Sequence, residues 1–190
     1  MKSASLIVDP NQKVEDLHDL GSRLKLPPGW SFRAPILARD LVFMSDEGKA
    51  QIGFANSSTT VDGVEGRAPY PKKTTRVCQV ANLYPQYFQV VALTDAKVNS
   101  FADLQGKTLV TQSKGNTAEA LTGDVLKING MTYQSLAKVS FQASYTDAVD
   151  MMKDGHVQVF TLGTTAPASA VMDLASARNV QLVPVDDRTM

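Results

Sequence analysis

The chain has 190 residues, 43% of them hydrophobic, which is enough to bury one core or two small ones. Nineteen basic residues balance nineteen acidic ones, which excludes the net positive field that holds nucleic acid or an anionic membrane surface. One cysteine, Cys78, excludes an intrachain disulfide framework, and the two histidines, His18 and His156, complete no metal-ligand cluster. We therefore predict no metal and no cofactor.

Residues 1–47 differ in texture from the rest of the chain. Short apolar runs are broken by Pro-Pro-Gly and Asp-Glu-Gly, which predicts extended pieces and turns, with a short helix near residues 14–20. Trp30 and Phe32 alternate with polar neighbours, as in a half-buried strand, so core packing is favoured over ligand stacking. The first apolar run stops at Asp9, and we expect neither a secretory signal nor direct membrane insertion.

A regular pattern begins near residue 50. The stretch AQIGFA (50–55) predicts a short buried strand, and the residues at 57–60 predict the first turn of a helix. Two apolar strands are predicted at 76–83 and 86–93. Cys78 alternates with valines in the first of them, so we interpret it as a buried small hydrophobe rather than a reactive thiol.

After these strands, helical and extended patterns alternate four times. Such alternation is typical of βαβ units, so we predict an α/β fold with an open, largely parallel sheet and flanking helices. The predicted helices are 100–106, 116–130, 144–155 and 165–178, and the predicted strands are 107–112, 137–141, 157–163 and 180–186.

Capping residues and apolar faces mark these helices. Ser100 with Asp103, and Ser144 with Asp147, have the spacing of a capping box, and a glycine ends three of the helices. Apolar residues recur at helical spacing in two of them, which predicts packed faces. The glycines are Gly106, Gly130 and Gly155; the faces are Leu121, Val125 and Ile128 in one helix and Ala148, Met151 and Met152 in another.

Ligands of such sheets bind where the carboxyl ends of strands meet helix starts. Three polar segments fall there, at 56–59, 112–117 and 161–165, and none contains Asp, Glu, His or Cys. Hydroxyls, amides and free N–H groups favour binding an anion without reacting with it. One such loop is only what any helix start prefers, whereas three at one edge leave helix capping and ligand binding as equal alternatives.

Catalytic and nucleotide sites are not indicated. Lys114 precedes Gly115 instead of following the second glycine of a phosphate loop, and no dinucleotide fingerprint is present. Ser113 and the serines at 57–58 lack a nucleophile-elbow pattern. His156 fits a solvated strand edge, and the acidic residues at helix starts, Asp103, Glu119 and Asp147, fit caps. We predict no catalytic residue and no enzyme.

The stretches AQIGFANSSTTVDGVEGRAPY, VANLYPQYFQVVAL, SFADLQGKTLVTQSKGNTAEAL and YTDAVDMMKDGHVQVFTLGTTAPASAVMDLA, in this order, resemble the TAXI family of solute receptors for TRAP transporters. The resemblance covers about residues 48–190. It implies a periplasmic-binding-protein-like fold with two lobes and a small carboxylate ligand, such as glutamate or a dicarboxylate, in the cleft. It also implies a periplasmic location and a TRAP permease as the membrane partner.

The resemblance implies a set of ligand-binding residues as well. The loop 113–117 places a helix start against the ligand carboxylate, the strand end at 56–58 belongs to the first lobe, Tyr84 lies by the cleft, and 161–164 closes the second lobe's side. The implied ligand-binding residues are Asn56, Ser57, Ser58, Tyr84, Ser113, Gly115, Asn116, Thr117, Thr161, Gly163 and Thr164.

The ends of the chain depart from the family pattern. Nothing in 1–47 matches a signal or a first-lobe unit, so we predict a segment of separate origin there, a first-lobe remnant at 48–75 and mainly one lobe, the second, at 76–190. An alternative is a non-binding remnant or protein-interaction module whose N-terminal segment covers the cleft side with Trp30 and Phe32. The ligand's identity and the oligomeric state stay open.

Overall fold

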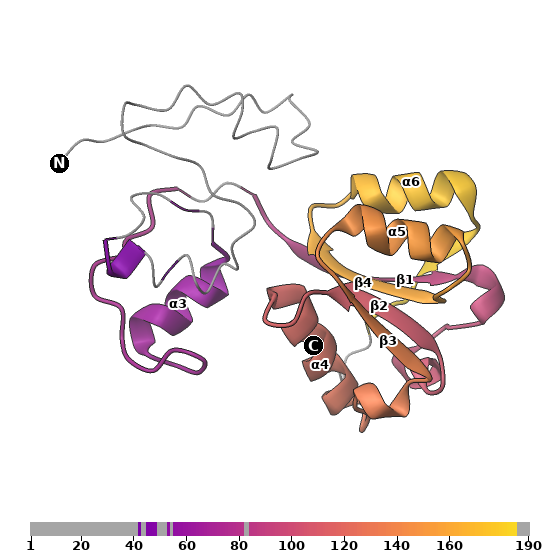
Figure 1. Cartoon of the computed structure of the whole chain (residues 1–190), viewed down its shortest axis with the longest axis horizontal. Coiled ribbons are helices and arrows are strands. Elements are labelled where there is room, and N and C mark those ends of the chain that lie inside the picture. Colours follow the sequence, from indigo (N-terminus) through magenta and orange to yellow (C-terminus); the bar gives the residue numbers. More distant parts are fainter. Residues whose placement is uncertain (1–41, 43–44, 49–52, 54, 82–83, 186–190) are drawn as a thin grey trace. The chain divides into compact units, whose positions relative to one another are not determined.

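The computed structural model describes residues 42, 45–48, 53, 55–81 and 84–185. The chain divides into two compact units, 1–36 and 37–190, and all described residues belong to the second (Figure 1). The expectations for the helix near 14–20, for Trp30 and for Phe32 therefore lie outside the described residues. So does most of the predicted strand 50–55.

A five-stranded sheet forms the centre of the second unit. Its strands are β1 (Tyr87–Leu93), β2 (Thr108–Gln112), β3 (Lys138–Gln142), β4 (Val159–Thr164) and β5 (Val180–Leu182), in the order β3-β2-β4-β1-β5. β2 runs parallel to β3 and β4, whereas β1 is antiparallel to both β4 and β5. The predicted open, largely parallel sheet is confirmed, with β1 as its one reversed strand.

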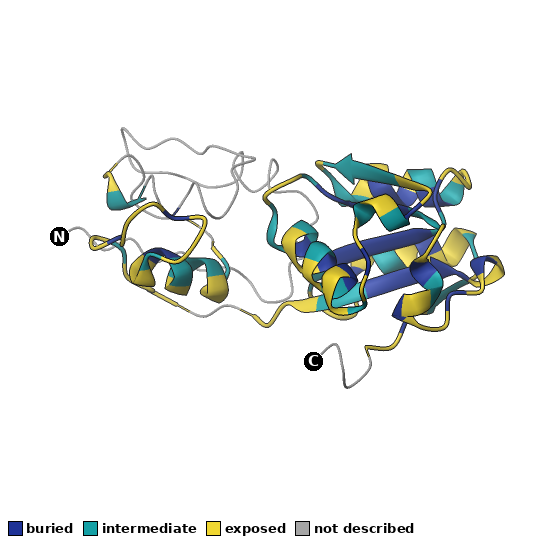
Figure 2. Cartoon of the chain, turned by 90° about the horizontal axis from the view of Figure 1, so that it is seen from below, coloured by how far each residue is buried: buried dark blue, intermediate teal, exposed yellow. Residues whose placement is uncertain are grey.

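Helices cover both faces of this sheet. α4 (Thr117–Ile128) lies on one face, and α5 (Tyr145–Lys153) and α6 (Ser169–Ala177) lie together on the other (Figure 1). The strands between them are largely buried, and the outward sides of the helices are exposed (Figure 2). The predicted flanking helices are therefore confirmed.

The core is built from apolar side chains on both faces of the central strands. Phe160 of β4 is fully buried and packs edge-on against the Tyr145 ring, with the ring centroids 6.1 Å apart. Ala148 and Met152 of α5 are buried and Met151 packs against the core, as predicted. Burying each large side chain stabilises the fold by about 1.5–3 kcal/mol.

The predicted helix signals are largely confirmed. The Ser144 hydroxyl accepts the Asp147 N–H at 3.1 Å at the start of α5. Gly130 and Gly155 follow α4 and α5 with φ of 71° and 73°, in the left-handed region that glycine adopts without strain. The predicted helix 100–106 is shorter than expected, a 3-10 turn (η2, Phe101–Leu104), because its hydrogen bonds close only one tight turn.

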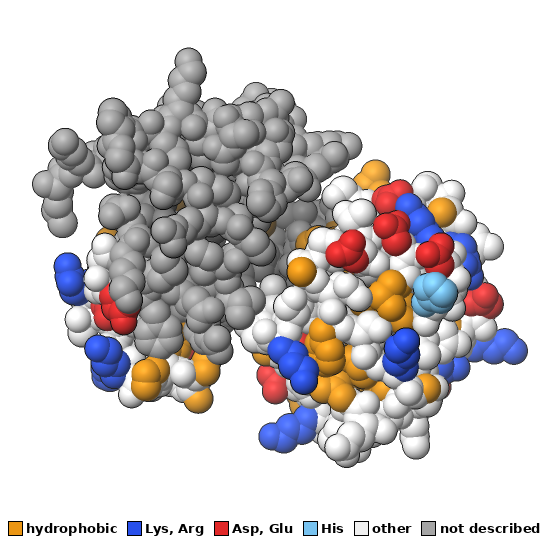
Figure 3. All heavy atoms as spheres, in the orientation of Figure 1, with side chains coloured by type: hydrophobic (Ala, Val, Ile, Leu, Met, Phe, Trp, Pro, Cys, Tyr) orange, Lys and Arg blue, Asp and Glu red, His pale blue; other side chains and the backbone are white. Residues whose placement is uncertain are grey.

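The predicted apolar face of α4 is confirmed at Val125, which packs against the core, and is wrong at Leu121 and Ile128. Leu121 and Ile128 are 40% and 55% exposed, and hydrophobic side chains reach the surface in this region (Figure 3). The buried stripe is instead Ala118, Thr122 and Leu126, spaced four residues apart. Ala118 and Thr122 are small, so the start of α4 lies close to the sheet. A leucine at either of these two positions would prevent this close approach.

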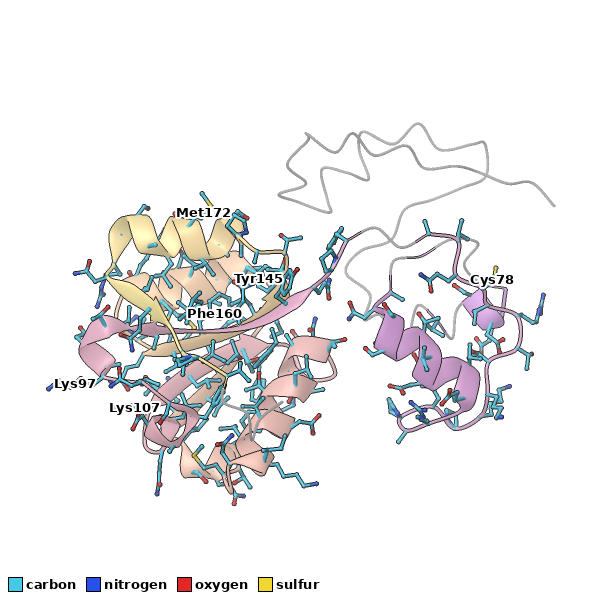
Figure 4. The ribbon with its side chains drawn as sticks, turned by 180° about the vertical axis from the view of Figure 1, so that it is seen from behind. Cys78, Lys97, Lys107, Tyr145, Phe160 and Met172 are labelled. Atoms are coloured by element: carbon cyan, nitrogen blue, oxygen red, sulfur yellow. The ribbon has the colours of Figure 1, made fainter. Side chains whose placement is uncertain are left out.

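The predicted strand 76–83 is also wrong over its described part. Residues 76–81 are irregular, Val80 is 83% exposed, and Cys78 is exposed rather than buried (Figure 4). Both edges of β1 are already occupied, by β4 on one side and β5 on the other. The next strand along the chain, β1, therefore has no free edge with which residues 76–81 could pair.

The helix predicted to begin at residues 57–60 is confirmed as α3 (Ser57–Glu65). It ends at Gly66, which has φ of 70° and whose N–H donates to the Gly63 carbonyl. Gly63 is buried, and a Cβ there would lie 3.0 Å from Val42 and 3.3 Å from Tyr70. Glycine at this position therefore allows the segments on either side of α3 to pack against it.

Replacing Asp103 by asparagine is expected to lower the melting temperature at neutral pH by a few degrees. Its carboxylate accepts the Asn99 N–H, the Ser100 hydroxyl and the Ser100 N–H at 2.9–3.0 Å, and these bonds hold its pKa below the usual 3.8. The stabilisation is present above that value and is lost as the pH falls through the lowered pKa. Thermal melts from pH 7 to pH 2 should show the two proteins converging in acid.

Asp147→Asn is the matched control, since Asp147 is also the third residue of a helix. Within the described residues its carboxylate accepts no hydrogen bond, so its replacement should cost less and show a weaker pH dependence. A pH-independent difference between Asp103→Asn and the wild-type protein would contradict the role given to the carboxylate.

Candidate functional site

The candidate site lies at one edge of the sheet. The parallel pairing of β2 with β3 and β4 brings their carboxyl ends to this edge, and the Tyr87–Thr164 pairing brings the start of β1 there too. The loop 113–116 and the start of α4 follow β2 directly. Two of the three polar segments of the sequence therefore end at this edge, as predicted.

Hydrogen bonds within the loop fix the start of α4. The Asn116 N–H donates to the Ser113 carbonyl at 3.0 Å, and the Asn116 side-chain oxygen accepts the Ala118 N–H at 2.9 Å. Gly115 has φ of 87°, and its N–H donates to the Glu119 carboxylate at 3.1 Å. Among the described residues, no chain partner remains for the N–H groups of Thr117 and Glu119.

The start of α3 meets the start of α4 through a side-chain contact. Asn56 precedes α3 in an extended conformation and makes no cap bond to its own helix. Its Nδ2 instead donates to the Thr117 hydroxyl at 2.6 Å. The residues after Asn56, Ser57 and Ser58, are exposed on the first turn of α3. Two helix starts, with their unpaired N–H groups, are thus joined at one point.

A cluster around Glu119 holds the loop in place. The Tyr133 hydroxyl donates to the Glu119 carboxylate at 3.0 Å, while burial, reinforced by that carboxylate, raises the pKa of Tyr133. The hydroxyl therefore stays a donor at neutral pH. The Tyr133 ring packs edge-on against Phe141, and the Lys114 ammonium lies 5.0 Å from the centre of the Phe141 ring.

The sequence predicts only a capping role for Glu119, and its hydrogen bond with Tyr133 was not predicted. The spacing from Asn116 to Glu119 is a visible helix-start signal. Tyr133 and Phe141, in contrast, come from a separate 3-10 turn, η3 (Tyr133–Ser135), and from β3, and only the parallel sheet brings them to the loop.

The third polar segment, 161–165, begins inside the strand predicted at 157–163, which β4 (Val159–Thr164) confirms. β4 continues to Thr164, so Thr161 and Gly163 lie within the strand. Thr161 is 1% exposed and accepts a hydrogen bond from Thr122 of α4 at 2.8 Å. A Cβ on Gly163 would meet the Ala118 Cβ at 3.4 Å. These two residues seat α4 on the sheet, and Thr164 ends the strand at the edge.

An aromatic pair lies beside the end of β4. The Tyr145 hydroxyl donates to the Gly163 carbonyl at 2.9 Å, and burial, followed by the nearby Tyr84, raises the pKa of Tyr145. Tyr84 is 54% exposed. Figure 4 shows the Tyr145 side chain beside the start of β1. Tyr145 was not among the predicted site residues, because its helical apolar position gave no sign that it reaches the strand end.

The polar groups at this edge are better suited to binding a ligand than to catalysing a reaction. They are hydroxyls, amides and backbone N–H groups, with Glu119 and Lys114 as the charged members of the loop and first turn. Within the described part of the chain, no group of three His, Cys, Asp or Glu side chains could hold a metal ion. A shallow hollow lined by Thr94, Asp95, Arg178 and Asn179 lies at the opposite ends of the strands, away from these groups.

A family model gives the fold its context. The model of the NMT1-like family matches residues 39–190. The chain belongs to the NMT1-like family. The matched region includes residues 39–47, which the sequence analysis placed in a separate segment. Among described residues, this family member contains no helix that is long and apolar enough to cross a membrane.

Solved structures show the same fold at low identity. An ancestral arginine-binding protein bound to arginine is 18% identical, with a TM-score of 0.51 over 80% of this chain and 60% of that chain. The periplasmic aliphatic sulphonate binding protein of Escherichia coli is 13% identical, with a TM-score of 0.52 over 80% of this chain and 46% of that chain.

The binding protein component of an ABC phosphonate transporter from Pseudomonas aeruginosa is 14% identical, with a TM-score of 0.53 over 82% of this chain and 53% of that chain. This NMT1-like chain thus spans 46–60% of the length of these three structures. The predicted periplasmic-binding-protein-like fold is confirmed. The TAXI resemblance stays a prediction.

Proposed function

We propose that this chain is the ligand-binding part of an extracytoplasmic solute receptor that takes a small carboxylate at the joined starts of α3 and α4. The observation that carries the proposal is the 2.6 Å hydrogen bond from Asn56 Nδ2 to the Thr117 hydroxyl. It brings together two helix ends whose dipoles both favour a negative charge. Membership of the NMT1-like family and the fold of the binding-protein neighbours support the same reading.

The binding step follows from the free donors. A carboxylate between the helix starts accepts the N–H groups of Thr117 and Glu119 and the hydroxyls of Ser57 and Ser58, which water otherwise occupies. The Asn56–Thr117 contact lies where such a ligand enters. Binding therefore replaces this hydrogen bond between neutral groups with hydrogen bonds to the charged carboxylate, which are stronger. Tyr84, Ser113 and Thr164 border the same edge.

The partner and the location come from the TAXI resemblance. It implies that the receptor delivers its ligand to a TRAP permease in the membrane and works in the periplasm, with no role in binding nucleic acid. The phosphonate-binding neighbour belongs to an ABC transporter. Co-purification of the chain with a TRAP permease, compared with an ABC permease, separates the two classes of transporter. No enzymatic activity is proposed.

Calorimetric and thermal-shift titration with glutamate, 2-oxoglutarate and succinate tests the proposal. Saturable binding that raises the melting temperature is expected, because a ligand that binds only the folded state stabilises it by mass action. Sodium chloride at the same ionic strength is the control. No shift with any of the three acids, nor with a monocarboxylic acid such as 4-oxopentanoate, at millimolar concentration would remove the carboxylate receptor and leave the non-binding interaction module.

Glu119→Gln is expected to tighten carboxylate binding about two- to fivefold, because it removes a negative charge worth about 0.3–1 kcal/mol near the helix start. The glutamine carbonyl can still accept the Gly115 N–H, and its NH2 group can donate to the Tyr133 hydroxyl, which keeps its bond to the Glu119 backbone carbonyl. Titration of both proteins at low salt measures the change, which should shrink at high salt.

Glu65→Gln is the control, since Glu65 ends α3 and pairs with Arg67 away from the helix start. It removes the same charge and should leave the affinity unchanged. Equal effects of the two substitutions would show that the ligand's charge does not lie at the start of α4.

A further inference from the structure

Gln112 is a buried amide without a partner for its nitrogen. It is the last residue of β2 and only 5% exposed, and its Nε2 makes no hydrogen bond within the described part of the chain. An unpaired buried donor costs about 1–3 kcal/mol, and native proteins keep few of them. This donor stands directly before the loop that starts α4.

The strand pattern gives the direction of the Gln112 side chain. The Thr111 hydroxyl contacts Thr122 of α4, and side chains alternate along a strand, so Gln112 lies on the opposite face, under α5. Parallel pairing places it beside Gln142 of β3. The Gln142 amide has an acceptor, the Met151 sulfur at 3.3 Å. Of two neighbouring glutamines, only Gln112 leaves its Nε2 unpaired.

The side chains that the strand register and the described contacts place on the face of Gln112 at this edge carry no formal charge. The Tyr145 ring covers Phe160 on the same face, and its hydroxyl is bound to the Gly163 carbonyl (Figure 4). Gln142, whose amide is engaged with Met151, and Tyr145 therefore add no formal charge beside Gln112. In its buried orientation the Gln112 Nε2 makes no hydrogen bond. Rotation of the side chain toward an acceptor at the edge therefore breaks no hydrogen bond of this nitrogen.

We infer that Gln112 is a specificity residue that donates to an uncharged acceptor, a ketone or amide oxygen, at the end of the ligand remote from its carboxylate. The inference rests on the proposed function, which supplies the carboxylate at the start of α4. A neutral amide can donate a hydrogen bond to a carbonyl oxygen of the ligand, and no charged group is removed from water. A second carboxylate on the ligand would lose its hydration among neutral groups, which is unfavourable in free energy. The ligand class is thus an oxo or carbamoyl monocarboxylic acid.

Calorimetry of the full chain with 4-oxopentanoate and pentanoate tests this inference, because the two acids differ in one carbonyl oxygen. The wild-type protein should bind 4-oxopentanoate about tenfold more tightly. Gln112→Leu should reduce the preference to less than twofold. The same variant should raise the melting temperature of the ligand-free protein, since it removes the unpaired donor.

Gln142→Leu is the matched control, and it should keep the preference while losing the Met151 contact. Gln112→Met gives the same measurement with an unbranched side chain should leucine prevent folding. An unchanged preference in a Gln112 variant that binds both acids overturns the inference and leaves the proposed function standing. Failure of the wild-type protein to bind either acid, together with the three acids of the first titration, overturns both.

Discussion

Replacing Phe160 by alanine is expected to lower the free energy of unfolding by about 3–5 kcal/mol. Phe160 is fully buried in β4, the middle strand of the sheet, between Val91 of β1 and Val110 of β2 in the strand register. The substitution removes the ring and leaves a cavity that the paired strands close only in part. Urea unfolding, followed by circular dichroism, measures the difference.

The loss is a large fraction of the 5–15 kcal/mol that stabilises a typical domain. Met172→Ala is the control, because Met172 is 58% exposed on α6 and its truncation should change stability by less than about 0.5 kcal/mol. Figure 4 shows Met172 on helix α6 and Phe160 at the sheet. Similar losses for both variants would mean that β4 is not the centre of the core.

The order of strands and helices from residue 86 onward could be predicted from the sequence because each signal is local. Ser144 with Asp147, and Gly130 after its helix, act on the backbone within one turn. The pairing of both edges of β1, in contrast, depends on strands that are distant in the sequence. This pairing decides that residues 76–81 stay outside the sheet and that Cys78 is exposed, although its alternating neighbours resemble those of a strand.

The candidate site could be predicted in part for the same reason. Asn116 and Thr117 follow from the preference of helix starts for such residues, and the structure adds the contact from Asn56. Thr161 lies in the strand predicted at 157–163, but spacing along the chain could not show that its hydroxyl bonds to Thr122 rather than to a ligand. The groups that only packing brings to the edge, Tyr133 and Tyr145, could not be found from spacing along the chain.

Thr122→Val is expected to destabilise the fold by about 1–3 kcal/mol, although valine has the same shape. The Thr122 hydroxyl lies 2.6 Å from the Ala118 carbonyl oxygen, 2.8 Å from the Thr161 hydroxyl and 3.3 Å from the Thr111 hydroxyl. All three threonines are at most 2% exposed. The valine leaves two buried hydroxyls without their shared partner, and no water reaches them.

The triple variant Thr111→Val, Thr122→Val, Thr161→Val should recover most of that loss. Replacing every partner of a buried polar cluster by apolar groups of the same shape is nearly neutral, because no donor or acceptor is left unpaired. Urea unfolding of the single and triple variants gives the coupling between the three sites. Losses that add across the three sites would show that the hydroxyls do not act as one cluster.

Ligand titration of the triple variant also decides the predicted role of Thr161. A paired hydroxyl in the core holds α4 against β2 and β4, so the affinity for the carboxylate should stay within twofold of the wild-type value if α4 keeps its position. Loss of binding in a variant with wild-type stability would indicate that Thr161 contacts the ligand, as the TAXI resemblance implies. The threonine cluster therefore separates the residues that hold the start of α4 in place from those that touch the bound acid.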